Sequence, residues 1–166
     1  ARAASDALFA EKSGKVSSTL NVVSVDLQTK TLVLARNNEC PMYLARGEEI
    51  EQLNETSKSI GTTRNTKPII TEIPLEPGLT VVVYTDGLVH AGSRRGNAMD
   101  VGFTLRGLLE DSNPSSQEIA DALLAQAVRL DDNRPADDIS VLVLRVVSND
   151  SADPVRRMSV RLPIRV

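Results

Sequence analysis

The chain has 166 residues, of which 41% are hydrophobic, so it has the length of one domain and enough apolar material for a substantial core. A net charge of −3 and an aromatic content of 2% leave neither a basic surplus for phosphate backbones nor stacking platforms for bases, which excludes nucleic acid as a predicted partner. The single cysteine, Cys40, cannot form an internal disulfide, and no secretory signal or apolar span of membrane length is found. We therefore predict a cytoplasmic protein without membrane insertion.

The first half of the chain predicts a short helix followed by antiparallel strands. The helix extends to about Lys12 and is broken at Gly14. Alternation of apolar and polar residues then predicts strands over residues 19–26, 31–36, 42–45 and 50–53. Because their connections have hairpin length, we expect an antiparallel meander. Asn37 and Asn38 are expected to be left-handed turn residues, and Gly61 a hinge in the polar loop over 54–68.

The second half predicts strands over 69–73, 80–84 and 139–147, with helices over 101–109 and 117–130 between the last two strands. Ser115 and Glu118 have the spacing of a capping box, and an apolar stripe follows on the second helix. Strands in runs with the helices grouped together predict an α+β sandwich rather than alternating βαβ units.

Two aspartates stand at the ends of strongly apolar strands. Asp86 follows the run over 81–85, and Asp137 precedes the run over 139–144. Such strands are buried on both faces, so a carboxylate at the end lies on the rim of a packed sheet. Gly87 allows a sharp turn or a close approach to a ligand, and Asp137 enters its strand from a polar loop. Each aspartate alone is better explained by turn chemistry; together they favour one shared cation.

The segments Tyr84-Thr85-Asp86-Gly87 and Asp137-Asp138-Ile139-Ser140 resemble the late motifs of the metal-dependent type 2C protein serine/threonine phosphatases, particularly their bacterial SpoIIE-like branch. Ile73-Pro74-Leu75-Glu76-Pro77-Gly78 precedes the first motif, as it does in that family. The resemblance covers roughly residues 19–146 and implies an antiparallel β-sandwich flanked by helices. Residues 1–147 would be the C-terminal part of the family's domain, and 148–166 a polar linker followed by a C-terminal edge strand.

The resemblance also implies a chemistry. In the family, the aspartates that match Asp86 and Asp137 bind one of two Mn²⁺ or Mg²⁺ ions, which activate a water for hydrolysis of phosphoserine or phosphothreonine. Asp138 and Gly87 would lie beside these ligands. Arg94 and Arg95 either contact the substrate phosphate through bidentate hydrogen bonds or form a solvated loop. We expect His90 and Cys40 to have structural rather than catalytic roles.

The family's early motifs are not found in this sequence. These motifs, a Gly-Gly-Asp strand and a Gly-Asp-Val-x-Gly-His-Gly turn, supply the aspartate that bridges the two metals and a backbone carbonyl ligand. We therefore expect that the chain lacks its natural N-terminal portion. By itself it should bind divalent metal weakly and show little phosphatase activity.

The resemblance implies a phosphoprotein substrate. SpoIIE-like relatives commonly dephosphorylate anti-sigma-factor antagonists and belong to larger sensor proteins, so a homodimer and a further sensor domain both stay open. One alternative is a noncatalytic regulatory or binding module on the same fold. Another is a different phosphate enzyme, but a haloacid-dehalogenase phosphatase needs a second aspartate where this chain has Tyr84. A receiver domain needs an early acidic pair within an alternating βα order.

Overall fold

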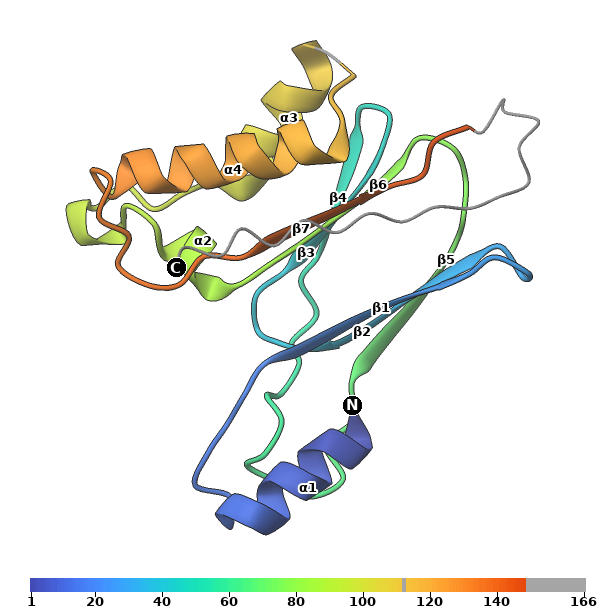
Figure 1. The fold of residues 1–166 in the computed structure, drawn as a ribbon, viewed down its shortest axis with the longest axis vertical. Helices are drawn as coiled ribbons and strands as arrows, with labels where there is room; N and C mark the ends of the chain where they lie inside the picture. Colours follow the sequence, from blue (N-terminus) through green and yellow to red (C-terminus); the bar gives the residue numbers. More distant parts are fainter. Residues whose placement is uncertain (112, 149–166) are drawn as a thin grey trace, which may run out of the picture.

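Two antiparallel sheets and four α-helices make up the protein, as the computed structural model shows for residues 1–111 and 113–148 (Figure 1). The first sheet has the strand order β1-β2-β5 and the second the order β4-β3-β6-β7. The strands are β1 (Leu20–Asp26), β2 (Thr31–Asn37), β3 (Met42–Arg46), β4 (Glu49–Leu53), β5 (Ile69–Pro74), β6 (Leu79–Tyr84) and β7 (Val141–Arg145). The helices are α1 (Arg2–Lys12), α2 (Asp86–His90), α3 (Val101–Asp111) and α4 (Ser116–Leu130), with a 3-10 turn, η1, over Ser93–Arg95. The predicted α+β sandwich is thus confirmed, whereas the predicted C-terminal edge strand falls on 149–166, outside the described residues.

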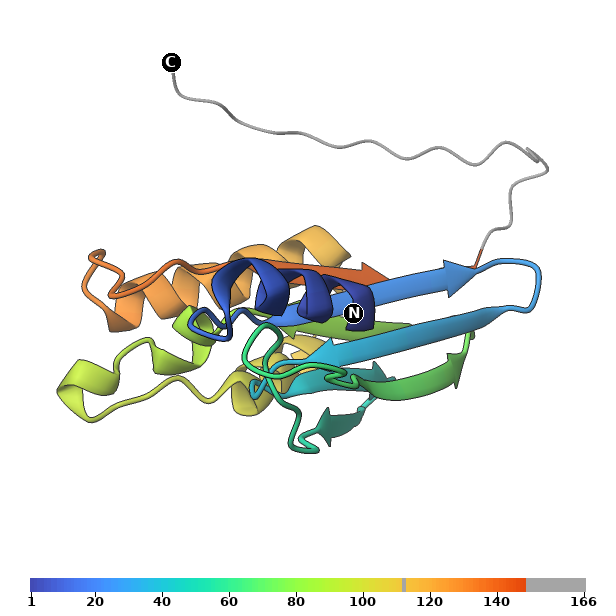
Figure 2. The same cartoon turned by 90° about the horizontal axis from the view of Figure 1, so that it is seen from below.

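The elements are stacked in layers. Helices α3 and α4 cover one face of the four-stranded sheet, the three-stranded sheet packs on its other face, and α1 lies at the far end of the molecule from α4 (Figures 1 and 2). None of the helices in the described part of the chain is both long and apolar enough to cross a bilayer.

Strand β6 lies at the centre of this arrangement, and all six of its residues are buried. Val82 and Tyr84 contribute to the apolar cluster under the helices, while Val81 and Val83 contribute to the cluster between the two sheets. Successive side chains of a strand point to opposite faces, so a strand covered on both sides must be apolar throughout. The predicted burial of this strand on both faces is confirmed.

The predicted meander over residues 19–53 is wrong in one respect. The hairpins β1-β2 and β3-β4 both form, but β2 pairs with β5 and β3 pairs with β6, so the chain changes sheet between Asn37 and Met42. The side chain of Asn37 is fully buried and donates hydrogen bonds to the carbonyls of Lys58 (3.0 Å) and Lys67 (3.2 Å). These bonds hold the crossing in place, and pairing information of this kind is absent from local periodicity.

Three residues of the connecting segments also differ from prediction. Asn37 ends β2 and neither it nor Asn38 has a positive φ; Asn38 Oδ1 instead accepts a hydrogen bond from the Cys40 amide at 2.9 Å. Gly61 is buried with φ +93°, and an added Cβ would lie 2.5 Å from Leu8 Cδ2. It is therefore a packing contact between the loop and α1, not a hinge.

The capping box of α4 is confirmed. The Ser115 hydroxyl accepts a hydrogen bond from the Glu118 amide (3.2 Å), and the Glu118 carboxylate accepts one from the Ser115 amide (2.7 Å). The inward stripe of Ile119, Leu123 and Ala127 is fully buried. Since α4 is anchored at its start and along one face, the loop that begins at its C-terminal end leaves from a defined position.

Candidate metal site

The two predicted aspartate segments lie side by side at one end of the four-stranded sheet. Strands β6 and β7 are antiparallel, and Tyr84 at the end of β6 pairs with Val141 at the start of β7. Beyond this pair, the Thr85 amide donates to the Ser140 carbonyl (3.1 Å). The Thr85 hydroxyl donates to the Asp138 carbonyl (3.1 Å) and accepts from the Ser140 amide (2.9 Å). Thr85 therefore ties the segment before Asp86 to the segment after Asp137.

The strand ends differ slightly from the prediction. Asp86 is the first residue of α2, and β7 begins at Val141 rather than at residue 139. Asp137 consequently lies in the loop that precedes β7, and its carboxylate accepts a hydrogen bond from the Asp138 amide at 2.8 Å. Both Asp86 and Asp137 are exposed, so a cation can reach their carboxylates.

Gly87 explains how closely the two segments approach. It is buried in α2, and a Cβ at this position would lie 2.5 Å from the Asp138 carbonyl oxygen and 3.2 Å from Ile139 Cγ1. Of the two roles predicted for Gly87, a sharp turn does not form, because the residue is helical, and a close approach to a ligand stays a prediction. Its lack of a side chain instead allows a close approach between Gly87 and the main chain of Asp138.

Asp86 lines a surface hollow of about 540 Å³ together with Cys40, His90 and polar side chains of neighbouring loops. Asp137 is not among the described residues that line this hollow. Carboxylate oxygens are the donors that Mn²⁺ and Mg²⁺ prefer, and both ions keep several waters, so Asp86 and Asp137 fit such a cation in kind. Within residues 1–111 and 113–148, however, no group of three or more His, Cys, Asp and Glu side chains is placed to hold a metal.

Cys40 and His90 border the hollow without forming a nucleophile and base. Burial raises the pKa of the Cys40 thiol, and the negative charges of Asp86 and Glu39 raise it further. A thiol with a raised pKa stays protonated near neutral pH and is a poor nucleophile. Cys40 also packs against the apolar cluster under the helices, which fits the packing role predicted for it, whereas His90 is exposed at the end of α2 and its structural role stays a prediction.

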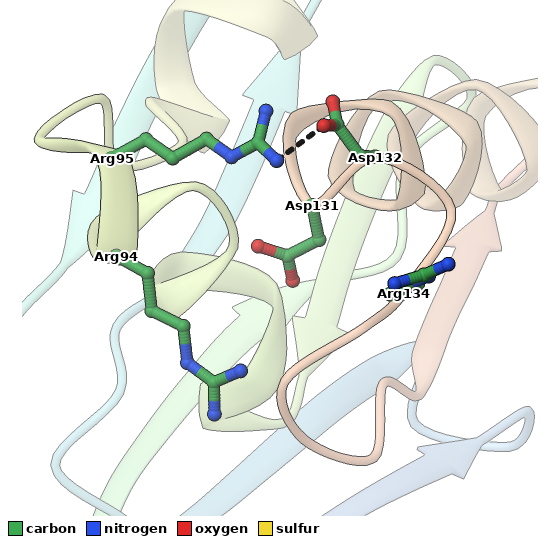
Figure 3. A pocket seen from close by; sticks show the side chains of 5 residues that line it. All are labelled: Arg94, Arg95, Asp131, Asp132 and Arg134. Carbon is green, nitrogen blue, oxygen red and sulfur yellow. Dashed lines mark ion pairs between the residues drawn. The ribbon is translucent and has the colours of Figure 1, made fainter.

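Arg94 and Arg95 do not line the hollow around Asp86. They belong to the 3-10 turn between Gly92 and Gly96 and line a second hollow, of about 510 Å³, with Asp131, Asp132 and Arg134 (Figure 3). The two hollows share no lining residue. Arg95 forms an ion pair with Asp132, whereas in the described part of the chain neither Arg94 nor Arg134 lies within ion-pair distance of a carboxylate.

Asp131 connects the two loops that form this second hollow, and sequence patterns did not single it out. Its carboxylate accepts hydrogen bonds from the Gly92 amide (2.9 Å) and the Ala136 amide (3.2 Å). The bond from Gly92, followed by the bond from Ala136 and the charges of Arg94 and Arg95, lowers the pKa of Asp131, while burial acts in the opposite direction. In the sequence Asp131 is one residue of an ordinary polar loop, so only its contacts across the fold reveal the role.

The lowered pKa of Asp131 predicts a pH effect. A carboxyl group with a lower pKa in the folded state contributes stability above its unfolded pKa, and this contribution is lost as the pH falls through the folded pKa. Asp131→Asn should therefore reduce stability at neutral pH and leave a shallower loss of stability in acid than the unchanged protein shows. Urea unfolding at several pH values measures both effects. Equal acid dependence in the two proteins would contradict the assignment.

Comparison with known proteins decides the family. The family described as Stage II sporulation protein E (SpoIIE) matches residues 1–147. This chain belongs to the SpoIIE family. Among curated proteins, Stage II sporulation protein E of Bacillus subtilis (strain 168) is 24% identical over 137 residues, which are 81% of this chain and 16% of that protein. The chain thus spans about a sixth of the length of this relative.

Solved structures related to this SpoIIE family member have the same fold. The SiaA-PP2C domain of Pseudomonas aeruginosa is 27% identical with a TM-score of 0.67, over 85% of this chain and 57% of that one. The catalytic domain of the serine/threonine protein phosphatase PstP, solved in complex with two manganese ions, is 19% identical with a TM-score of 0.66, over 89% of this chain and 68% of that one. The predicted type 2C phosphatase-like fold is confirmed.

Proposed function

We propose that this chain belongs to a Mn²⁺- or Mg²⁺-dependent protein phosphatase that hydrolyses phosphoserine or phosphothreonine on a regulatory protein. The observation that carries the proposal is the placement of the Asp86 and Asp137 segments side by side, joined through Thr85 at the ends of β6 and β7. Membership of the SpoIIE family and the phosphatase folds of the matched structures support it.

In this proposal Asp86 and Asp137 bind one cation. When bound, such a cation supplies an acidified water and positive charge for the phosphoryl oxygens. Gly87 and Asp138 set the spacing, because the main chain of Asp138 can approach α2 only where no Cβ intervenes. Thr85 fixes the register of the two segments through its hydroxyl, which both donates and accepts. The second ion of the family site needs further protein ligands, which the described residues do not offer as a group.

Several finer points belong to the same proposal. Residues 1–147 are taken as the C-terminal part of a phosphatase-like domain. An anti-sigma-factor antagonist in the cytoplasm is the substrate we favour, on the basis of the resemblance to SpoIIE-like phosphatases. The alternative is a noncatalytic regulatory module on this fold, which fits a sequence without the family's early motifs; within the described residues no three His, Cys, Asp or Glu side chains are grouped to hold a metal.

Metal-dependent activity distinguishes the proposed phosphatase from the noncatalytic regulatory module. The natural full-length protein should hydrolyse a phosphoserine peptide in the presence of Mn²⁺ or Mg²⁺ and lose this activity in excess chelator, with recovery when metal is restored. Phosphate release measured under the three conditions tests this. A protein that binds the phosphopeptide without turning it over at any metal concentration would instead be the regulatory module.

A further inference from the structure

The arginine hollow, lined by Arg94, Arg95, Asp131, Asp132 and Arg134, carries an excess of positive charge (Figure 3). Three arginines and two aspartates line it, which leaves one net positive charge. Asp132 is engaged with Arg95, and the Asp131 carboxylate is engaged with the amides of Gly92 and Ala136. In the described part of the chain, neither Arg94 nor Arg134 lies within ion-pair distance of a carboxylate, and the charge of Arg94 acts on Asp131 only over a longer range.

The backbone that presents these arginines is defined on both sides. Gly92 and Gly96 take positive φ angles at the two ends of η1, and the amides of Arg95 and Gly96 donate to the carbonyls of Gly92 (2.9 Å) and Ser93 (3.0 Å). On the facing loop, the amide of Arg134 donates to the Asp131 carbonyl at 3.0 Å. The link from Gly92 to Asp131 joins the two loops, so the arginines are held in relation to one another.

The hollow lies on loops that continue directly from the candidate metal site. Arg94 and Arg95 follow α2, which begins at Asp86, and the loop that carries Arg134 leads into Asp137. Since the hollow around Asp86 and the arginine hollow share no lining residue, a phosphoryl group at Asp86 and an anion at the arginines would be separate groups. One bound polypeptide could place a group in each.

From this arrangement we propose that the arginine hollow binds a carboxylate-bearing segment of the phosphoprotein substrate, next to the phosphorylated residue. Guanidinium groups bind carboxylates through paired, charge-assisted hydrogen bonds, and Arg94 and Arg134 have this capacity free. The inference rests on the proposed phosphatase function and adds a substrate preference to it: phosphorylated residues flanked by acidic residues are preferred over those flanked by neutral ones.

The test compares two phosphoserine peptides, one flanked by glutamates and one by glutamines, with the metal-loaded natural protein. We expect a lower KM for the glutamate peptide. Arg94→Gln and Arg134→Gln should each raise the KM for the glutamate peptide about three- to tenfold, because exposed charge pairs contribute modestly to binding. Both variants should leave kcat unchanged, because the lost contact stabilises the bound substrate and the transition state equally. The KM for the glutamine peptide should not change. Arg106→Gln, an exposed arginine on α3, is the matched control and should behave as the unchanged protein.

A second measurement separates this inference from the phosphatase proposal. A fluorescent glutamate-rich peptide without phosphate should bind with an affinity that Arg134→Gln weakens and that added salt reduces, as anisotropy reports. If this binding is seen while no metal condition gives turnover, the phosphatase proposal fails and the anion site stands. Equal KM values for the two phosphopeptides, or equal losses in the Arg106→Gln control, would overturn the anion site.

Discussion

Replacing Asp86 by alanine is expected to reduce Mn²⁺-dependent phosphatase turnover about a hundredfold or more, since a catalytic cation contributes several kcal/mol of charge stabilisation and each 1.4 kcal/mol is a factor of about ten. Asp137→Ala should have the same effect if, as proposed, the two carboxylates bind one cation. Phosphate release from a phosphoserine peptide, measured over a range of Mn²⁺ concentrations, gives the loss in both variants.

The fold should survive the Asp86→Ala substitution. Asp86 is exposed at the start of α2, so its removal costs no packing and changes the free energy of unfolding by less than about 1 kcal/mol through the helix dipole. Asp121→Ala, an exposed carboxylate on α4, is the control and should keep full activity. Normal turnover in Asp86→Ala, or full activity in excess chelator, would exclude the proposed site.

Gly87→Ala is expected to destabilise the protein and to weaken metal binding together. The added methyl group would lie 2.5 Å from the Asp138 carbonyl oxygen, which is main chain and cannot rotate away. Overpacking of this kind costs about 1–3 kcal/mol, and relief requires the loop that carries Asp137 to move away from Asp86. Denaturant unfolding and calorimetric titration with Mn²⁺ measure the two consequences.

Gly107→Ala is the matched control, because Gly107 lies in α3 with no atom within 4 Å of an added Cβ. Alanine is the better helix former, so this variant should be more stable by about 0.5–1 kcal/mol and should bind metal normally. If Gly87→Ala were as stable as the unchanged protein, the close contact between α2 and Asp138 would not exist in solution.

Local sequence was sufficient for most of the elements. The alternation in β2, the continuous apolar run of β6 and the Ser115–Glu118 capping box each depend on contacts that a few neighbouring residues determine. These features could be predicted because the physical cause and its effect lie within one turn or one strand.

Strand partners could not be predicted in the same way. The crossing from β2 to the second sheet depends on a buried Asn37 whose hydrogen-bond partners, Lys58 and Lys67, lie 21 and 30 residues away. Periodicity assigns a strand its two faces but does not name the neighbouring strand, so two hairpins in different sheets have the same local signature as a meander.

By itself, the sequence determined the strands, the helices α1, α3 and α4, the α+β class and the two aspartate motifs, since burial of β6 on both faces forces Asp86 to the rim of a sheet. Helix α2 and the turn η1 were not predicted. Tertiary structure alone decided that Thr85 and Gly87 bring the Asp137 segment against that rim. It also decided that Arg94 and Arg95 meet Arg134 in a hollow of their own, linked through Asp131. These contacts join residues about 40 to 55 positions apart, and contacts across such separations arise only when packed strands and helices bring distant loops together.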